Sequence, residues 1–196
     1  MLKIGITGGI GSGKSTVSKI FEVLGIPVFY ADDATKNIMN ESPVIRQKLI
    51  EYFGGDAYAG EVLNRKFIAS QVFNDKEKLA FLNSVTHPEA IRYASEWMQK
   101  QTAPYAIKEA ALFFESGSQE GIDIMIGVYT PKAMRIHRIM QRDSVTREEV
   151  LKRMQNQINE EIKMRLCDYV IINDEQHPVI DQVLVLHEKF MAVYGQ

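Results

Sequence analysis

The segment with the clearest chemical signature begins at Gly8 and reads Gly-Gly-Ile-Gly-Ser-Gly-Lys-Ser, which fits the pattern GxxxxGK followed by Ser or Thr. Its glycines let the backbone curl so that successive amides point inward, and the start of a following helix adds positive potential. A loop of this kind binds phosphate: Lys14 reaches the β- and γ-phosphates of a nucleotide, and the Ser15 hydroxyl ligates Mg²⁺. The alternative, a strand-to-helix turn without a ligand, needs neither the lysine nor four glycines in this register. The candidate nucleotide-binding residues are Gly8, Gly9, Gly11, Ser12, Gly13, Lys14, Ser15 and Thr16.

A pair of aspartates follows the next apolar run along the chain. Asp32 is placed to take a proton from an acceptor hydroxyl or to hold a water on Mg²⁺. The alternative is an N-cap for a helix over 34–39, a position that aspartate favours. Asp33 is expected to face solvent in the first helical turn.

Glu109 closes a third apolar run, and a carboxylate there needs a partner because burying an unpaired charge is costly. A metal ion or a metal-bound water would serve. A buried ion pair with Lys108 or another basic residue is the alternative. Glu115, six residues later, either faces the substrate or caps a short helix.

A basic segment lies further along the chain, where residues 131–153 hold seven basic and three acidic residues. Arginines at i, i+3 and i+7 share one face of a predicted helix: Arg135, Arg138 and Arg142. Apolar positions lie roughly opposite: Ala133, Ile136 and Met140. The arrangement suits a lid over polyphosphate, with Arg138 and Arg142 stabilising the transferring group. The alternative is a solvated helix face with local ion pairs.

Five apolar runs must position these residues. They are nearly continuous, as expected for strands buried on both faces: Leu2–Thr7, Ile26–Tyr30, Tyr105–Ala110, Asp123–Tyr129 and Tyr169–Asn173. Strands that alternate with helices predict an α/β fold in which helices cover a parallel sheet. Ligands bind beyond the carboxyl ends of such strands, where Asp32 would lie beside the phosphate-binding loop.

The long interval between the second and third runs is irregular. Residues 31–103 carry several helical patterns and no convincing strand, and Gly54-Gly55 and Tyr58–Gly60 resemble loops. His87-Pro88 predicts a break or kink in a helix. We therefore predict one domain with three parts: a nucleotide-binding core (1–30, 104–130 and 165–196), a helical insertion (31–103) and a lid region (131–164).

Helix starts are predicted at three further places. Ser42-Pro43 and Thr130-Pro131 each resemble an N-cap followed by a proline in the first turn. Thr146 and Glu149 have the spacing of a capping box.

The composition of the 196 residues is that of an ordinary globular protein, with 45% hydrophobic and 24% charged residues. A net charge of -2 argues against a general nucleic-acid or membrane-surface binder. One cysteine, Cys167, forms neither an internal disulfide nor a cysteine-based zinc site, and the histidines show no metal-ligand spacing. We expect a cytoplasmic protein, monomeric or weakly homo-oligomeric, that acts on a small molecule.

The phosphate-binding loop alone does not choose among GTPases, motor ATPases and small-molecule kinases. The guanine-reading and switch patterns NKxD and DxxG are absent from the sequence, and the chain has little room for the partner domains of a motor. A kinase of a small metabolite fits best.

Taken in order, these motifs resemble those of the dephospho-coenzyme A kinases over essentially the full chain. The matching stretches are residues 7–16, Ala31-Asp32, His87-Pro88, Leu112–Glu115 and Gln141–Asp143 with Val145–Glu148. The resemblance implies a five-stranded parallel sheet of the P-loop nucleoside-kinase type with helices on both faces, a helical substrate-binding insertion and a lid. It also implies transfer of the γ-phosphoryl group of Mg²⁺-ATP to the ribose 3′-hydroxyl of dephospho-coenzyme A.

The same resemblance implies roles for individual residues. Asp32 is the base, Lys14, Arg138 and Arg142 stabilise the transferring phosphoryl group, and Arg142 also contacts the nucleotide. Ser15 and Glu109 hold the metal. The acceptor is bound by Asp32, Lys36, His87, Glu115 and Arg138.

The sequence departs from the family pattern at several positions. Tyr30 stands where the family usually has a first aspartate before Ala31-Asp32, and Glu109 stands where an aspartate is usual. Lys36 replaces a common arginine, which keeps the charge but loses the bidentate fork. Arg92 is the nearest candidate for an arginine often found soon after His-Pro. Two alternatives remain open: a kinase of another nucleotide or small metabolite, and a nucleotide-binding sensor without catalysis.

Overall fold

The computed structural model describes residues 1–73 and 75–194. The chain divides into two compact units, one formed by Met1–Tyr30 with Met98–Gln196 and the other by Ala31–Trp97. Among the described residues, no helix combines the length and the apolar character needed to cross a membrane.

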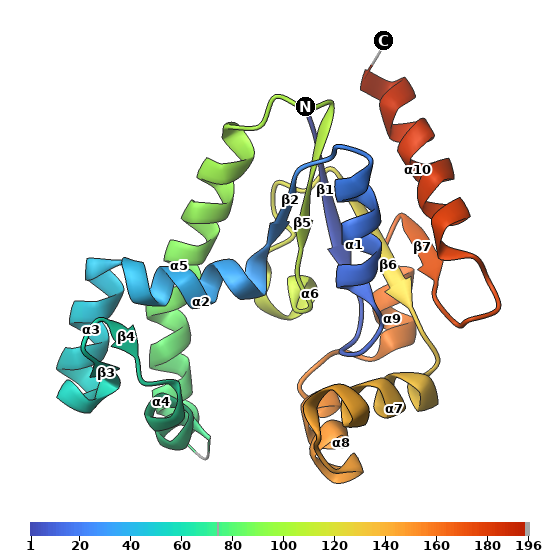
Figure 1. The fold of residues 1–196 in the computed structure, drawn as a ribbon. Helices are drawn as coiled ribbons and strands as arrows, with labels where there is room; N and C mark the ends of the chain where they lie inside the picture. Colours follow the sequence, from blue (N-terminus) through green and yellow to red (C-terminus); the bar gives the residue numbers. More distant parts are fainter. Residues whose placement is uncertain (74, 195–196) are drawn as a thin grey trace. The chain divides into compact units, whose positions relative to one another are not determined.

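The first unit contains a five-stranded sheet in the order β2-β5-β1-β6-β7, and every pair of neighbours is parallel (Figure 1). Its strands are β1 (Leu2–Thr7), β2 (Val28–Tyr30), β5 (Tyr105–Glu109), β6 (Ile124–Tyr129) and β7 (Tyr169–Ile172). All five predicted strands are thus confirmed. The second begins two residues late because Pro27 has no amide hydrogen to donate, although its carbonyl accepts from the Ile107 amide (2.9 Å).

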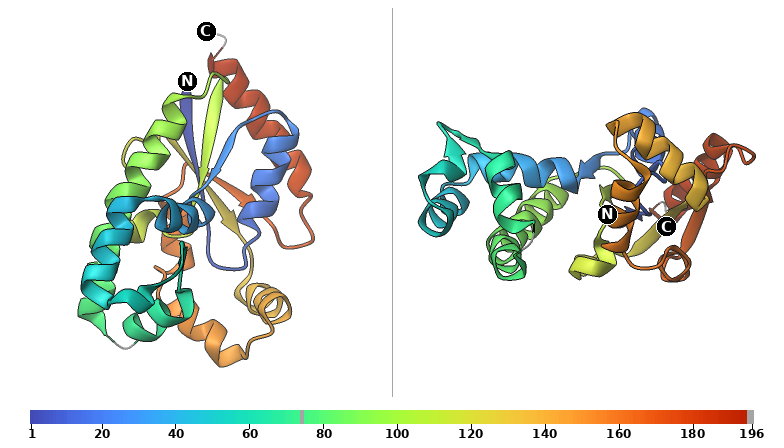
Figure 2. Two further views of the ribbon diagram at one scale, coloured as in Figure 1. Left: turned by 60° about the vertical axis from the view of Figure 1, so that its left-hand side comes forward. Right: turned by 90° about the horizontal axis from the view of Figure 1, so that it is seen from below.

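Helices cover both faces of this sheet. Helices α1 (Lys14–Val23) and α10 (Val179–Tyr194) lie on the same face (Figure 1 and Figure 2). Apolar residues of these two helices form one core with every second side chain of β1 and β6. The helix residues are Val17, Phe21, Val183, Leu186 and Phe190, and the strand residues are Ile4, Ile6, Ile126 and Val128. On the other face, α9 (Glu160–Arg165) covers β6, where a Cβ on Gly127 would lie 2.7 Å from the Met164 sulfur. The helices on both faces explain why the strands are almost continuously apolar.

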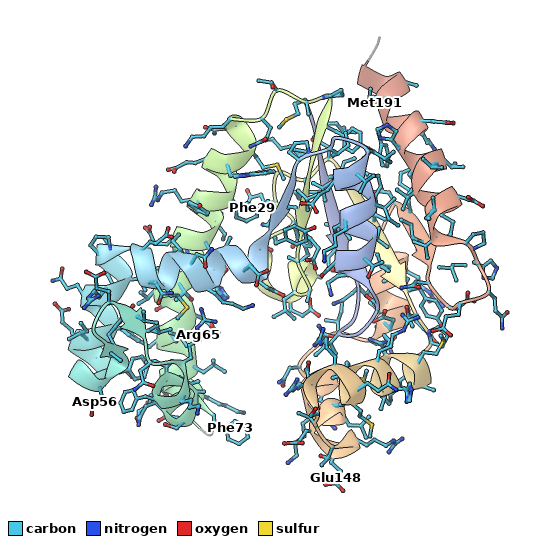
Figure 3. All side chains as sticks on the ribbon, viewed as in Figure 1. Phe29, Asp56, Arg65, Phe73, Glu148 and Met191 are labelled. Atoms are coloured by element: carbon cyan, nitrogen blue, oxygen red, sulfur yellow. The ribbon has the colours of Figure 1, made fainter. Side chains whose placement is uncertain are left out.

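Three further helices complete the first unit at the carboxyl ends of the strands: α6 (Phe113–Ser116), α7 (Lys132–Asp143) and α8 (Arg147–Gln155). Helices α7 and α8 form a hairpin closed by Ile136, Ile139 and Val150, and Glu148 projects from it away from the sheet (Figure 3). The Thr146–Glu149 capping box is confirmed, with both reciprocal hydrogen bonds present.

Two expectations for α7 are wrong. Pro131, rather than Thr130, is its N-cap, because the Thr130 hydroxyl is bonded to the carbonyls of Ser12 and Asn173 instead. The apolar face also differs: Ile136 is buried with Ile139, whereas Ala133 and Met140 are exposed. The buried face of α7 therefore consists of Arg135, Ile136 and Ile139, and it lies to one side of the predicted apolar stripe.

The second unit is mainly helical. It contains α2 (Ala31–Glu41), α3 (Pro43–Phe53), the 3₁₀ turn Gly55–Ala57, α4 (Arg65–Val72) and most of α5 (Lys76–Gln99). The Ser42 N-cap is confirmed by a hydrogen bond from the Ile45 amide to its side chain. A core of Ile38, Ile45, Leu49, Ala57, Tyr58, Leu63, Ile68 and Val85 holds the unit together.

The expectation that this unit contains no strand is wrong. A short antiparallel hairpin, β3 (Tyr58–Ala59) with β4 (Val62–Leu63), lies where no strand was expected. It is held by tertiary contacts, since the Tyr58 hydroxyl donates to the Met39 carbonyl (2.6 Å) and the Leu63 amide donates to Asn40 Oδ1 (2.9 Å). Of the break or kink predicted at His87-Pro88, the break is wrong, because helix α5 continues through these residues, and the kink stays a prediction. Pro88 cannot donate one backbone hydrogen bond, but the 24-residue helix has full turns before and after it, and their hydrogen bonds keep the helix continuous.

Candidate active site

The loop between β1 and α1 is shaped by glycines. Gly11 and Gly13 have φ angles of +81° and +89°, which side chains other than glycine rarely adopt. A Cβ on Gly11 would lie 2.8 Å from the Arg135 carbonyl oxygen, and one on Gly13 would overlap the Asn173 side chain. Helix α1 begins at Lys14, and the amides of Thr16 and Val17 donate to the carbonyl of its N-cap residue Gly13 (3.0 and 3.1 Å), so the amino end of the helix lies at the loop. The helix dipole at this end favours an anion such as phosphate.

Side chains at the ends of two other strands hold this loop in place. The Ser12 carbonyl accepts hydrogen bonds from Thr130 Oγ1 and Asn173 Nδ2, each 2.9 Å long. Thr130 follows β6 directly and Asn173 follows β7, so the loop after β1 is also hydrogen-bonded to the ends of these two later strands. No motif in the sequence assigns these two residues to the site, because the contact depends on the order of the strands.

Lys14, Ser15 and Glu109 meet at the carboxyl edge of the sheet. Ser15 Oγ donates to Glu109 Oε2 (3.4 Å), and Lys14 Nζ lies 3.9 Å from Glu109 Oε1. Lys14 and Glu109 are both buried, with 9% and 6% of each residue exposed. The structure therefore brings together one ammonium group, one hydroxyl and one carboxylate beside the first turn of α1.

Lys108, the neighbour of Glu109 along β5, does not take part in this cluster. Its Nζ donates to the Ser118 carbonyl (3.3 Å) and lies 5.0 Å from the centroid of the Phe113 ring. Burial lowers the pKa of its ammonium group from the ordinary value. Glu109 thus forms a buried ion pair with another basic residue, Lys14 of the glycine-rich loop, as the alternative to a metal ion predicted.

The two arginines of the predicted lid, Arg138 and Arg142, are paired with carboxylates. Arg138 Nη2 lies 3.1 Å from Glu175 Oε1, and its Nη1 reaches Thr130 Oγ1 (3.5 Å). Arg142 makes two hydrogen bonds to Asp143 (2.7 and 3.2 Å). These bonds, with those from Arg153, hold the pKa of Asp143 at about 2. Both predicted arginines are accessible enough to exchange such partners for phosphate.

Arg135, the third arginine of the predicted face, is different. Its residue is 6% exposed, and Nη1 lies 3.2 Å from Glu160 Oε2. Glu160 Oε1 in turn accepts the amide hydrogen of Gly9 (3.3 Å), and Gln157 Oε1 accepts that of Ile10 (2.9 Å). The sequence pattern did not indicate either contact, because Gln157 and Glu160 lie 147 and 151 residues from their partners in the loop.

Glu115 lies on α6 and is engaged within the first unit. Its Oε1 is 2.9 Å from Nζ of Lys163, which is completely buried, and it accepts the Ile158 amide hydrogen (3.0 Å). Lys163 Nζ also donates to the Ala111 carbonyl (2.8 Å). The substrate contact expected of Glu115 stays a prediction.

The remaining predicted residues lie in the second unit. Asp32 and Asp33 are exposed in the first turn of α2, so Asp32 is a helical residue rather than the N-cap. Lys36 pairs with Asp33 (2.6 Å), and His87 is exposed on α5. A cation that the sequence analysis missed, Arg65, donates to the Lys36 carbonyl (3.4 Å).

Two of the departures from the family pattern have structural counterparts. The Tyr30 hydroxyl donates to Glu22 Oε2 on α1 (2.9 Å), so this residue is anchored toward α1. Arg92 is exposed and pairs with Glu89 and Glu96 along its own helix. The pKa of its guanidinium group is raised, chiefly by the hydrogen bond to Glu89.

A glycine-rich phosphate-binding loop with a lysine and a carboxylate at the edge of a five-stranded parallel sheet defines a P-loop nucleotide-binding protein. The sequence model of the dephospho-CoA kinases matches residues 2–178. The chain belongs to the dephospho-CoA kinase family.

Individual relatives agree with this assignment. A dephospho-CoA kinase of Bacteroides fragilis is 36% identical over 94% of this chain and 91% of its own length. One from Salinibacter ruber is 39% identical over 89% of both chains. A dephospho-CoA kinase structure from Campylobacter jejuni superposes with a TM-score of 0.71 at 29% identity, covering 99% of this chain and 98% of that one. A shikimate kinase from Acinetobacter baumannii shares the fold alone, with a TM-score of 0.53 at 13% identity over 98% of this chain and 94% of that one.

Proposed function

We propose that this enzyme transfers the γ-phosphoryl group of ATP to the ribose 3′-hydroxyl of dephospho-coenzyme A, giving coenzyme A and ADP. Membership of the family supports the reaction. The observation that carries it is the cluster of Lys14, Ser15 and Glu109 at the phosphate-binding loop. This cluster combines what phosphoryl transfer needs: a cation for the phosphates and oxygen atoms suited to a metal.

The donor set of the cluster fits Mg²⁺. Mg²⁺ prefers oxygen ligands and usually takes one or two from the protein, with substrate phosphates and water supplying the rest. The Ser15 hydroxyl and the Glu109 carboxylate would hold it, and among the described residues no group of three or more acidic, histidine or cysteine side chains forms a dedicated metal cage. When bound, Mg²⁺ neutralises negative charge on the phosphates.

On the nucleotide side, the amides at the start of α1 and the Lys14 ammonium group bind the phosphates. Arg138 and Arg142 stabilise the charge of the phosphoryl group in transfer. To reach it, they exchange their carboxylate partners for phosphate oxygens. Each of these groups acts by position and charge, and none forms a covalent bond to the substrate.

On the acceptor side, the Asp32 carboxylate accepts the proton of the 3′-hydroxyl. The hydroxyl oxygen then forms its bond to the γ-phosphorus while the bond from that phosphorus to ADP breaks. Tyr30, the last residue of β2, pairs in register with Glu109, and Asp32 follows it by two residues. Lys36, His87 and Glu115 contribute to binding the acceptor.

The test is ADP release coupled to a spectrophotometric readout, with Mg²⁺, ATP and dephospho-coenzyme A. ADP release that depends on the acceptor, and a product heavier by one phosphoryl group, is the expected result. ATP binding without transfer to this acceptor would overturn the proposal. Transfer to another metabolite would then indicate a different kinase, and none a nucleotide sensor.

A further inference from the structure

Two side chains beyond the lid helices hold the first half of the phosphate-binding loop. Gln157 lies between α8 and α9, and Glu160 is the first residue of α9. Their side-chain oxygens accept the amide hydrogens of Ile10 and Gly9, at 2.9 and 3.3 Å. Successive amides of the loop are thus bound by acceptors three residues apart on another segment.

Arg135 closes the arrangement from α7. Its Nη1 lies 3.2 Å from the second oxygen of the Glu160 carboxylate, and the side chains are 8% and 13% exposed. A Cβ on Gly9 would overlap Arg135 Nη1 and Glu160 Oε2. The close approach of this ion pair to the backbone therefore accounts for glycine at position 9.

The segment that carries both acceptors is itself anchored on its other side. The Ile158 amide donates to Glu115 Oε1 (3.0 Å), and the fully buried Lys163 joins Glu115 (2.9 Å) to the Ala111 carbonyl (2.8 Å). Asn159 caps α9 by accepting from the Glu161 and Ile162 amides. Residues 157–163 are therefore fastened between the loop after β5 and the phosphate-binding loop.

We infer that Gln157 and Glu160 are positioning residues for phosphate binding, which act by holding the amides of Ile10 and Gly9. Because the amides of Ile10 and Gly9 donate to protein oxygens, they are not the amides that bind the nucleotide. Holding them orients the rest of the loop, whose amides at the start of α1 face the phosphates. Arg135 then serves as the partner of Glu160, in contrast to Arg138 and Arg142, which act on phosphate directly. This inference rests on the proposed function of the loop as a nucleotide site.

The energetic reason is the order that a phosphate site needs. A loop that is already ordered binds its ligand without the entropic cost of fixing its backbone. Removal of the Gln157 oxygen also leaves the Ile10 amide without its acceptor, and a half-buried donor without a partner is unfavourable. Free rotation of the 9–10 peptide units would therefore weaken binding of the phosphates specifically.

The experiment measures ADP affinity by calorimetry in the full chain, with thermal unfolding as a parallel readout. Gln157→Leu keeps the size of the side chain and removes its acceptor oxygen. We expect its Kd for ADP to rise about tenfold, as for the loss of one hydrogen bond. KM for ATP should rise by a similar factor, whereas KM for the acceptor should stay within about twofold. Gln157→Asn withdraws the oxygen by one methylene and should weaken ADP binding in the same direction, should the leucine variant fold poorly.

The matched control is Gln155→Leu, which makes the same substitution at an exposed position of α8. Its ADP affinity should equal that of the wild type. The inference is overturned if both Gln157 variants bind ADP as tightly as the wild type, or if their only effect is a lower melting temperature. ADP binding requires no acceptor, so failure of the wild type to phosphorylate dephospho-coenzyme A would be seen separately.

Discussion

Ser15 Oγ donates a hydrogen bond to Glu109 Oε2 across 3.4 Å, joining the first turn of α1 to the last residue of β5. The two residues are 94 positions apart in the chain, and the parallel pairing of β1 with β5 brings them together. Both offer oxygen atoms beside Lys14, with Glu109 buried and Ser15 on the exposed side. The hydroxyl and the carboxylate are therefore expected to act on one metal ion.

Replacing Glu109 by glutamine should raise the Mg²⁺ concentration needed for half-maximal activity. The substitution removes a negative charge from an oxygen ligand set, and changes next to a metal typically cost about 10- to 100-fold in its affinity. Titration of activity with Mg²⁺ at saturating ATP measures the effect. Ser15→Thr keeps a hydroxyl and serves as the control for Ser15→Ala. An unchanged Mg²⁺ requirement in both Glu109→Gln and Ser15→Ala would exclude these ligands.

Asp32→Asn should fold and bind ATP but lose turnover by a factor on the order of 10² to 10⁴, the usual contribution of a general base. Steady-state kinetics with dephospho-coenzyme A measures this loss. Asp33→Asn is the control, because Asp33 is also exposed in the first turn of α2 and pairs with Lys36. Equal rates in the two variants would remove Asp32 from the role of base.

Arg138→Met should lower kcat by a factor on the order of 10² to 10³, the cost of one group that stabilises transition-state charge. Stopped-flow or steady-state assays at saturating substrates give the value. Glu175→Gln is informative beside it, because it releases Arg138 from its exposed partner. Such surface pairs contribute about 0–1 kcal/mol, so the melting temperature should hardly change. A loss of kcat in Glu175→Gln as large as that in Arg138→Met would contradict the assignment.

Lys163→Met should destabilise the enzyme by about 3–5 kcal/mol, because it leaves the Glu115 carboxylate without its buried partner. Urea unfolding followed by circular dichroism measures the free energy. The double variant Lys163→Met with Glu115→Gln removes both charges and should recover part of the loss. A double variant as unstable as the sum of the single ones would show that the pair itself contributes little.

Cys167 should resist alkylation while the protein is folded. Burial raises the pKa of its thiol to about 12 from an ordinary value of 9.0, and the negative charge of Asp168 adds to this. The thiol is therefore protonated at pH 8, and the thiolate is the reactive form. In unfolded chains the proton is lost at lower pH, so stability should fall as the pH rises through 9. Mass spectrometry after iodoacetamide treatment, with and without urea, checks the prediction: rapid labelling of the folded enzyme would contradict it.

The sheet could be predicted because its strands carry their own signal. Continuous apolar runs such as Leu2–Thr7 are compatible with burial on both faces, and helical patterns between them require parallel pairing. The phosphate-binding loop was equally readable, since the left-handed φ angles at Gly11 and Gly13 impose glycine locally. The Thr146 capping box belongs to the same group, because both partners lie within four residues.

Features whose physical cause lies within a few residues could be predicted: the strands, the glycine loop with Lys14 and Ser15, and most helix starts. Contacts between distant groups depend on how the strands and helices pack. The β3–β4 hairpin depends on contacts with α2. The Thr130 hydroxyl does not cap α7, because it donates to the Ser12 carbonyl instead. Arg135 follows the same periodicity as Arg138, yet only its position opposite Glu160 buries it. Periodicity sets the direction in which a side chain points, whereas its partner is set by the order of the strands and the packing of the helices upon them.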